Sequence, residues 1–209
     1  MPVLREKTPK RRIVTKKVGH YTEHKDNLRE DFNKRCGYCN DPDFFRSTYY
    51  EIDHFIPKNF LKSIFHIPEE YKNKEQEYSN LVYSCRFCNN AKGEKWPTRS
   101  MEIHHKDNVG FIDPCKSEYD KQFERNENSE IISLTELGNW IYKNLKLWKL
   151  EHSIIWQLDE LKYKIDEIEK IIAEKESVEK ERLEKMLCSF LKNYYRYHNQ
   201  LMEYYNNER

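Results

Sequence analysis

Two short stretches decide how this chain folds: Glu51-Ile52-Asp53-His54, and Asn80-Leu81-Val82-Tyr83-Ser84-Cys85-Arg86-Phe87-Cys88-Asn89-Asn90-Ala91-Lys92-Gly93. The longer stretch contains a Cys-x-x-Cys knuckle, and a matching knuckle, Cys36-Gly37-Tyr38-Cys39, precedes the shorter one. Two knuckles supply four thiolates, which is the ligand set of a tetrahedral structural zinc ion with no open position. We therefore predict a zinc clamp with these ligands: Cys36, Cys39, Cys85 and Cys88.

The residues around the clamp predict two strands and a helix. Aromatic and β-branched residues favour a strand over 44–56, most clearly over 49–54, and a second strand over 81–83. A short helix over 87–92 follows, and Gly93 is suited to end it. This order predicts a ββα unit.

Closing the clamp brings Asp53 and Asn89 to one side of this ββα unit. Carboxylate and amide oxygens are ligands that suit a hard cation such as Mg²⁺ or Mn²⁺. The pattern therefore predicts a second, catalytic metal site at Asp53 and Asn89, with Asn90 as an alternative to Asn89.

These motifs resemble the HNH family of endonucleases. The family pattern is Asp-His, then Asn-Leu, then Cys-x-x-Cys followed by His or Asn and a lysine. Here it is carried by Asp53-His54, Asn80-Leu81 and the run from Cys85 to Lys92, within a region from Cys36 to Trp96. Asn89 stands where many members have His.

The resemblance implies a zinc-clamped ββα-metal fold that hydrolyses phosphodiester bonds. It implies His54 as the general base that takes a proton from the attacking water, a role that imidazole fills near neutral pH. It further implies that Asn80 orients this imidazole and that Asp53 and Asn89 hold the catalytic metal.

A looser likeness extends through 111–114 and Phe123 to nuclease subunits of prokaryotic anti-phage defence, such as Septu-type and retron-associated systems. It implies a protein partner, for example an ATPase, and a nucleic-acid substrate, with DNA favoured over RNA. Two other functions stay open: a non-catalytic, zinc-dependent module that binds nucleic acid, and a protein-interaction subunit.

Composition places the chain among small, highly charged proteins. It has 209 residues, of which 37% are hydrophobic and 35% charged, and this favours a small core with long, charged helices. We expect no transmembrane span and no secretory signal. Paired Cys-x-x-Cys knuckles indicate thiolates on metal rather than disulfides, so a cytoplasmic location is expected.

Positive charge is concentrated near the N-terminus. Residues 1–17 carry a net charge of +6, residues 1–110 of +5 and residues 111–209 of −4. A basic arm over 1–20 either contacts phosphates or is a solvated terminus. Further candidates for phosphate contacts are three lysines: Lys58, Lys92 and Lys95.

The overall prediction is an α+β protein with the basic arm at 1–20, a nuclease domain at 21–130 and a helical C-terminal region at 131–209. We expect a helix from Thr22, capped by Thr22 itself, and a short helix near 67–71. Apolar residues spaced by three or four over 148–208 predict a helical hairpin or one long coiled-coil-like element, with a break near 174–177 and Ser177 as a cap. We expect this hairpin to dock a protein partner or a second copy of the chain.

Overall fold

A computed structural model describes residues 3–14, 18–46, 49–64, 71, 73–174 and 178–207. Contacts divide the chain into two compact units. The first comprises residues 1–127 and 131–148, and the second comprises 128–130 and 149–209. The boundaries predicted for the arm, the nuclease domain and the helical region stay predictions. The mixed composition of helices and small sheets confirms the predicted α+β class.

The first unit is built on the predicted ββα arrangement. Strand β1 (Tyr50–His54) pairs antiparallel with β2 (Leu81–Cys85), so that Asp53 lies opposite Val82 and His54 opposite Leu81. Helix α3 (Arg86–Lys92) follows β2 directly and contacts both strands. Every residue of β2 is buried, which makes this two-stranded sheet the centre of the core.

The helix before the first knuckle begins differently from the prediction. A 3₁₀ helix η1 (Tyr21–His24) leads into α1 (Lys25–Asp31). The cap is His20, which accepts from the backbone of Thr22 while Glu23 accepts from the His20 backbone. The predicted Thr22 cap is therefore wrong by two positions, because an imidazole here takes the usual role of a hydroxyl.

The basic N-terminal segment is held against the first unit by its arginines. Arg5 is buried and binds Asp120 at 2.5 Å and the Gly37 carbonyl at 2.9 Å. Arg11 binds Asp113 at 2.8 Å. Arg5 and Arg11 are both paired with carboxylates of the first unit, so the structure of residues 3–14 favours neither the phosphate-binding arm nor the solvated terminus that the sequence left open.

Short elements complete the first unit around this core. They are α2 (Lys58–Ser63), η3 (Tyr78–Asn80), the β3–β4 pair (His105–Lys106 and Val109–Gly110), α4 (Ser117–Asp120), the β5–β6 pair (Phe123–Arg125 and Ile131–Ser133) and α5 (Glu136–Leu145). Thr135 caps α5 by accepting from the Gly138 backbone at 2.9 Å. The helix predicted near 67–71 falls largely outside the described residues.

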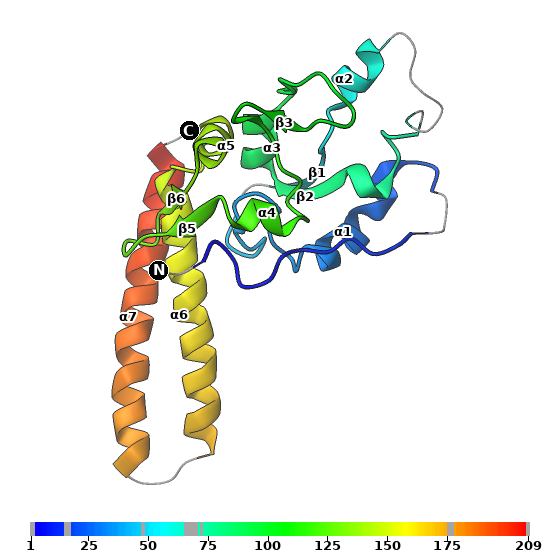
Figure 1. Ribbon diagram of the computed structural model, residues 1–209. Coiled ribbons are helices and arrows are strands. Elements are labelled where there is room, and N and C mark those ends of the chain that lie inside the picture. Colours follow the sequence, from blue (N-terminus) through cyan, green and yellow to red (C-terminus); the bar gives the residue numbers. More distant parts are fainter. Residues whose placement is uncertain are drawn as a thin grey trace. The chain divides into compact units, whose positions relative to one another are not determined.

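The second unit is a hairpin of two long helices, as predicted. Helix α6 (Leu150–Ala173) and α7 (Val178–Asn207) pack along one another, and Figure 1 shows them side by side. Leu158, Leu161, Ile165 and Ile168 form a buried stripe on α6 with helical spacing. The proposed Ser177 cap lies outside the described residues. None of the described helices has the length and apolar character that a membrane span requires.

Candidate active site and metal centre

The four knuckle cysteines meet in the core of the first unit. All are buried, and their sulfur atoms lie within 4.8 Å of one another. The Cys39 and Cys85 sulfurs are 3.9 Å apart, and a tetrahedral zinc with Zn–S bonds near 2.3 Å needs sulfurs about 3.8 Å apart. Burial raises the pKa of Cys39 and Cys88, which zinc would oppose by binding the thiolate. The cysteines fit a structural zinc ion.

Local sequence explains why the knuckles form. Gly37 sits so close to Phe32 and Val82 that an added Cβ would approach them to 2.7 and 2.8 Å, so this turn requires glycine. In the other knuckle the Cys85 sulfur accepts from the Cys88 backbone at 3.4 Å and thereby caps α3. The same residue is thus both a candidate zinc ligand and a helix cap.

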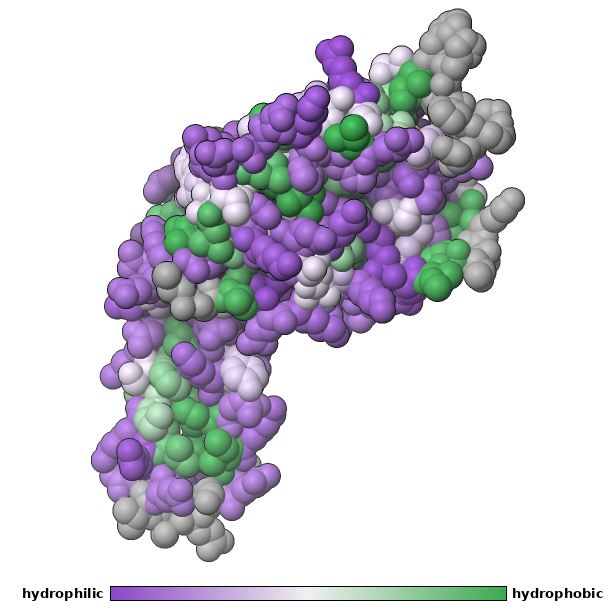
Figure 2. Space-filling model, viewed as in Figure 1, coloured by the Kyte–Doolittle hydropathy of each residue, from purple (hydrophilic) through white to green (hydrophobic). Residues whose placement is uncertain are grey.

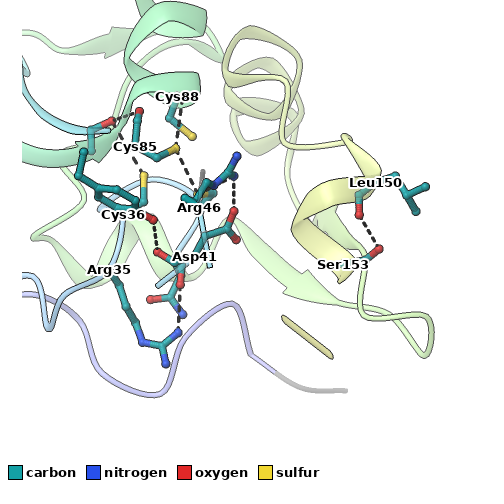
Figure 3. A network of polar contacts seen from close by, with 12 residues as sticks. Arg35, Cys36, Asp41, Arg46, Cys85, Cys88, Leu150 and Ser153 are labelled. Carbon is teal, nitrogen blue, oxygen red and sulfur yellow. Dashed lines mark hydrogen bonds and ion pairs between the residues drawn. The ribbon is translucent and has the colours of Figure 1, made fainter. Parts of the chain in front are cut away.

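A buried ion pair lies beside the cysteines. Arg46 and Asp41 bind each other with side chains that are each 1% exposed, and Arg46 also donates to the Cys39 sulfur at 3.9 Å. Figure 3 shows Arg46 between Asp41 and the sulfur atoms. A cation at this place counters the negative charge that four thiolates leave on zinc.

One cavity of about 820 Å³ brings together most of the predicted catalytic residues. Its wall comes from η1, β1, the start of α2 and α3. Asp53, His54 and Asn89 all line it, and Lys58 lies at its edge. The ββα unit therefore assembles in space the residues that the two stretches supply separately.

The His54 imidazole has a defined tautomer. Its Nε2 lies 2.9 Å from the Glu75 carbonyl oxygen, which can only accept, so Nε2 carries the proton. Nδ1 is left with its lone pair, and among the described residues nothing donates to it. Burial lowers the pKa of His54, which favours the neutral ring. A neutral imidazole with a free Nδ1 is the form that a general base needs.

Asn80 supports this histidine less directly than predicted. Its side chain accepts from the Ile56 backbone at 2.8 Å and donates to the carbonyls of Ile56 and Lys74, each at 3.2 Å. It thus joins the end of β1 to the segment that presents the Glu75 carbonyl. The described contacts of the Asn80 side chain are to the backbone of the two segments that flank the ring contact, and not to the imidazole itself.

Asp53 is held by two buried partners. The Tyr38 hydroxyl donates to its Oδ2 at 2.5 Å, and the Lys92 ammonium lies 3.2 Å from Oδ1 and 3.1 Å from Oδ2. Lys92 also donates to the His54 carbonyl at 2.8 Å and is 0% exposed. The prediction that Lys92 contacts a phosphate is therefore wrong, because its ammonium is fully buried and bound to Asp53 and to the His54 carbonyl.

Asn89 and Lys95 are the remaining predicted site residues. The Asn89 amide donates to Glu51 Oε2 at 2.7 Å, which leaves its oxygen without a donor among the described residues. This oxygen and the free lone pairs of Asp53 provide hard ligands on one cavity, so the residues present fit a divalent cation. Lys95 donates to the Asn144 carbonyl at 3.2 Å and lines a neighbouring cavity.

Sequence reasoning missed four participants in this site. Tyr38 stands between two knuckle cysteines, yet nothing in the spacing showed that it would reach Asp53. Glu75 acts through its main chain, so its side chain carries no signal. Tyr21 contacts the His54 ring from a distant element. Glu51 was within the quoted stretch, and its place two residues before Asp53 was the available clue.

Comparison with known proteins supports the resemblance seen in the motifs. A family model described as HNH endonuclease matches residues 58–95, which include the second knuckle, Asn80 and Asn89. Asp53 and His54 lie just before the matched segment. No curated protein and no solved structure matches the chain. The family match therefore covers residues 58–95 of a first unit that also holds the ββα arrangement and the four buried cysteines.

Proposed function

We propose that this protein is a metal-dependent endonuclease that hydrolyses phosphodiester bonds in nucleic acid. The observation that carries the proposal is the His54 ring, whose Nε2 lies against the Glu75 carbonyl, on the cavity that Asp53 and Asn89 also line. Pure binding needs neither a neutral base nor hard ligands next to it.

His54 accepts the proton of the attacking water at Nδ1. The resulting imidazolium keeps its Nε2–H bond to the Glu75 carbonyl, which stabilises the positive charge. Asn80 holds the two backbone segments that fix the ring, so the base keeps its orientation through the reaction. The neighbouring Asp53 carboxylate also favours the protonated ring.

Asp53 and Asn89 would hold a catalytic Mg²⁺ or Mn²⁺ through their oxygen atoms. When bound, this cation polarises the scissile phosphate and stabilises the leaving oxygen. Tyr38 and Lys92 orient the Asp53 carboxylate from behind, in the manner of outer partners that position metal ligands. The Asn89 amide is oriented by Glu51 in the same way.

The substrate and setting follow from the resemblance. We infer DNA in preference to RNA, and action in the cytoplasm as an effector of prokaryotic defence. The second unit supplies the docking site for a protein partner, because α6 and α7 leave large apolar residues exposed. These include Tyr163, Ile171, Met186, Leu191 and Tyr195. Figure 2 shows hydrophobic residues gathered among polar ones along the hairpin.

One observation favours a second function, that of a non-catalytic module that binds nucleic acid. The Asp53 carboxylate is already neutralised by the buried Lys92 ammonium at 3.1 Å. A cation that binds Asp53 must share this carboxylate with Lys92, which weakens the electrostatic attraction.

A nuclease assay decides between the two functions. Purified protein is incubated with plasmid, linear DNA or RNA, with Mg²⁺, Mn²⁺ or no divalent metal, and with His54→Ala as the control. Metal-dependent cleavage by wild type that disappears in His54→Ala supports the nuclease. Salt-dependent binding without cleavage by either protein supports the binding module.

Truncation after residue 148 tests the docking role of the hairpin. We expect the shortened protein to keep its zinc and its cleavage of naked nucleic acid but to lose its partner in copurification. A truncated protein that keeps its partner and loses salt-dependent nucleic-acid affinity would show that the hairpin binds the substrate instead.

A further inference from the structure

Tyr21 contributes to the catalytic cavity from outside the HNH match. It lies on η1, well before residues 58–95, and its ring meets the His54 ring edge to face with centroids 4.6 Å apart. The His20–Glu23 capping arrangement fixes the backbone at this point. The contact restrains the imidazole on one side, while the Glu75 carbonyl holds Nε2.

Tyr21 and Lys58 form a pair of donors beside His54. The Lys58 ammonium donates to the Tyr21 hydroxyl oxygen at 3.3 Å and lies 5.2 Å from the centre of the Tyr21 ring. Because the ammonium can only donate, the tyrosine oxygen accepts, and its own proton is free to point elsewhere. Within the described part of the chain, no acceptor for this hydroxyl proton is present.

Both side chains line the same cavity as His54 and Asn89. The O–H of Tyr21 and the remaining N–H bonds of Lys58 are therefore available to a group inside it. A ligand that accepts from both must carry at least two acceptor lone pairs and negative charge, which describes a phosphate oxygen. Three acidic groups line the wall. Glu51 and Glu94 are each engaged by an amide, from Asn89 and Asn59 respectively, and Asp53 is bound by Tyr38 and Lys92.

We propose that the Tyr21 hydroxyl and the Lys58 ammonium form a subsite for a non-bridging phosphate oxygen of the nucleic acid, adjacent to the His54 base. This proposal rests on the proposed function for the identity of the ligand. It assigns Tyr21 two tasks: its hydroxyl binds the phosphate, and its ring positions the imidazole.

Conservative substitutions separate these two tasks. Tyr21→Phe removes the hydroxyl and keeps the ring, whereas Tyr21→Ala removes both. Tyr163→Phe, at a 65% exposed tyrosine of α6, is the matched control for the loss of a hydroxyl. Lys58→Gln removes the ammonium, and Lys62→Gln removes an equal charge from an exposed position on the same helix.

Affinity for labelled DNA is measured without added divalent metal, and kcat and KM are measured with it. We expect Tyr21→Phe and Lys58→Gln each to weaken affinity about tenfold, as expected for one hydrogen bond to a charged group, with kcat nearly unchanged. The fold-loss of affinity in the double variant should be smaller than the product of the two single fold-losses, because both donors bind the same phosphate oxygen. Tyr21→Ala should also lower kcat, because it removes the ring that positions the imidazole. Tyr21→Phe keeps this ring, so its kcat should be close to that of wild type.

Two results would overturn the subsite. One is wild-type affinity and KM in Tyr21→Phe, which would leave the ring as the whole contribution of this residue. The other is an equal loss of affinity in Lys58→Gln and Lys62→Gln, which would reduce Lys58 to a diffuse surface charge. If wild type cleaves no substrate, the nuclease proposal fails, but the affinities still decide the subsite.

Discussion

The two units of this protein are stabilised in opposite ways. The first is built of many short elements and is held by groups far apart in sequence, such as four buried cysteines and the fully buried Lys92 against Asp53. The second is almost entirely helical, and its ion pairs are local and exposed, such as Lys162 with Asp166 and Lys185 with Glu181. Charged groups therefore matter for the stability of the first unit, where they are buried, and such exposed pairs contribute little to the stability of the second.

This difference shows how a small core can carry a polar site. Two long helices need only an apolar stripe to associate. The first unit instead buries carboxylates, a lysine and thiols around a two-stranded sheet, and each of them needs a partner. A zinc ion at the four cysteines would supply what such a small apolar core does not, since structural zinc contributes on the order of 10 kcal/mol of apparent binding energy.

The largest expected effect is the loss of the zinc clamp. Cys88→Ser should abolish zinc binding and unfold the first unit, while the hairpin keeps its helices. Elemental analysis, near-UV circular dichroism and limited proteolysis would follow the two units separately. Ser189→Ala, at an exposed residue of α7, serves as a control. A Cys88→Ser variant that melts like wild type would contradict the clamp.

The next effect is on catalysis alone. His54→Ala should lower the cleavage rate by roughly 10²–10⁴-fold, because the general base is lost while zinc and fold are retained. Cleavage under single-turnover conditions measures the rate, and zinc content confirms the fold. Undiminished cleavage would show that His54 is not the base and would favour the binding module.

A third effect distinguishes a buried lysine from a phosphate-binding one. Lys92→Met should destabilise the first unit by about 3–5 kcal/mol, because it leaves the Asp53 carboxylate buried without its cation. Chemical denaturation monitored by tryptophan fluorescence measures the change. Lys58→Gln is the comparison, and it should weaken nucleic-acid affinity with little loss of stability. The reverse pattern would restore Lys92 as a phosphate contact.

The smallest effect is expected on the hairpin surface. Lys162→Ala removes an i,i+4 pair with Asp166 in which both side chains are more than 40% exposed. Such pairs contribute about 0.3–0.5 kcal/mol, so the free energy of unfolding should barely change, and any change should vanish at high salt. Denaturation of the variant at low and high salt measures this. A loss above 1 kcal/mol would mean that the hairpin also depends on its charges.

Much of this architecture was predictable from local patterns. Cysteine spacing predicted the clamp, and the β-branched and aromatic runs predicted β1 and β2. Spacing of apolar residues predicted the two long helices. These features follow from periodicity and ligand chemistry, which are encoded within short windows of sequence. The residues on the catalytic cavity, Asp53, His54 and Asn89, came from motif resemblance, and their roles stay predictions.

Only the tertiary structure decided which polar groups satisfy one another. A lysine at the end of a short exposed helix usually points to solvent, but α3 packs its last turn onto β1, so Lys92 is buried against Asp53. The main-chain carbonyl of Glu75 contacts His54 although it lies 21 positions away in sequence. The Tyr21 ring contacts the same imidazole from 33 positions away. Such partners leave no local pattern, because chain folding alone brings them within hydrogen-bonding distance.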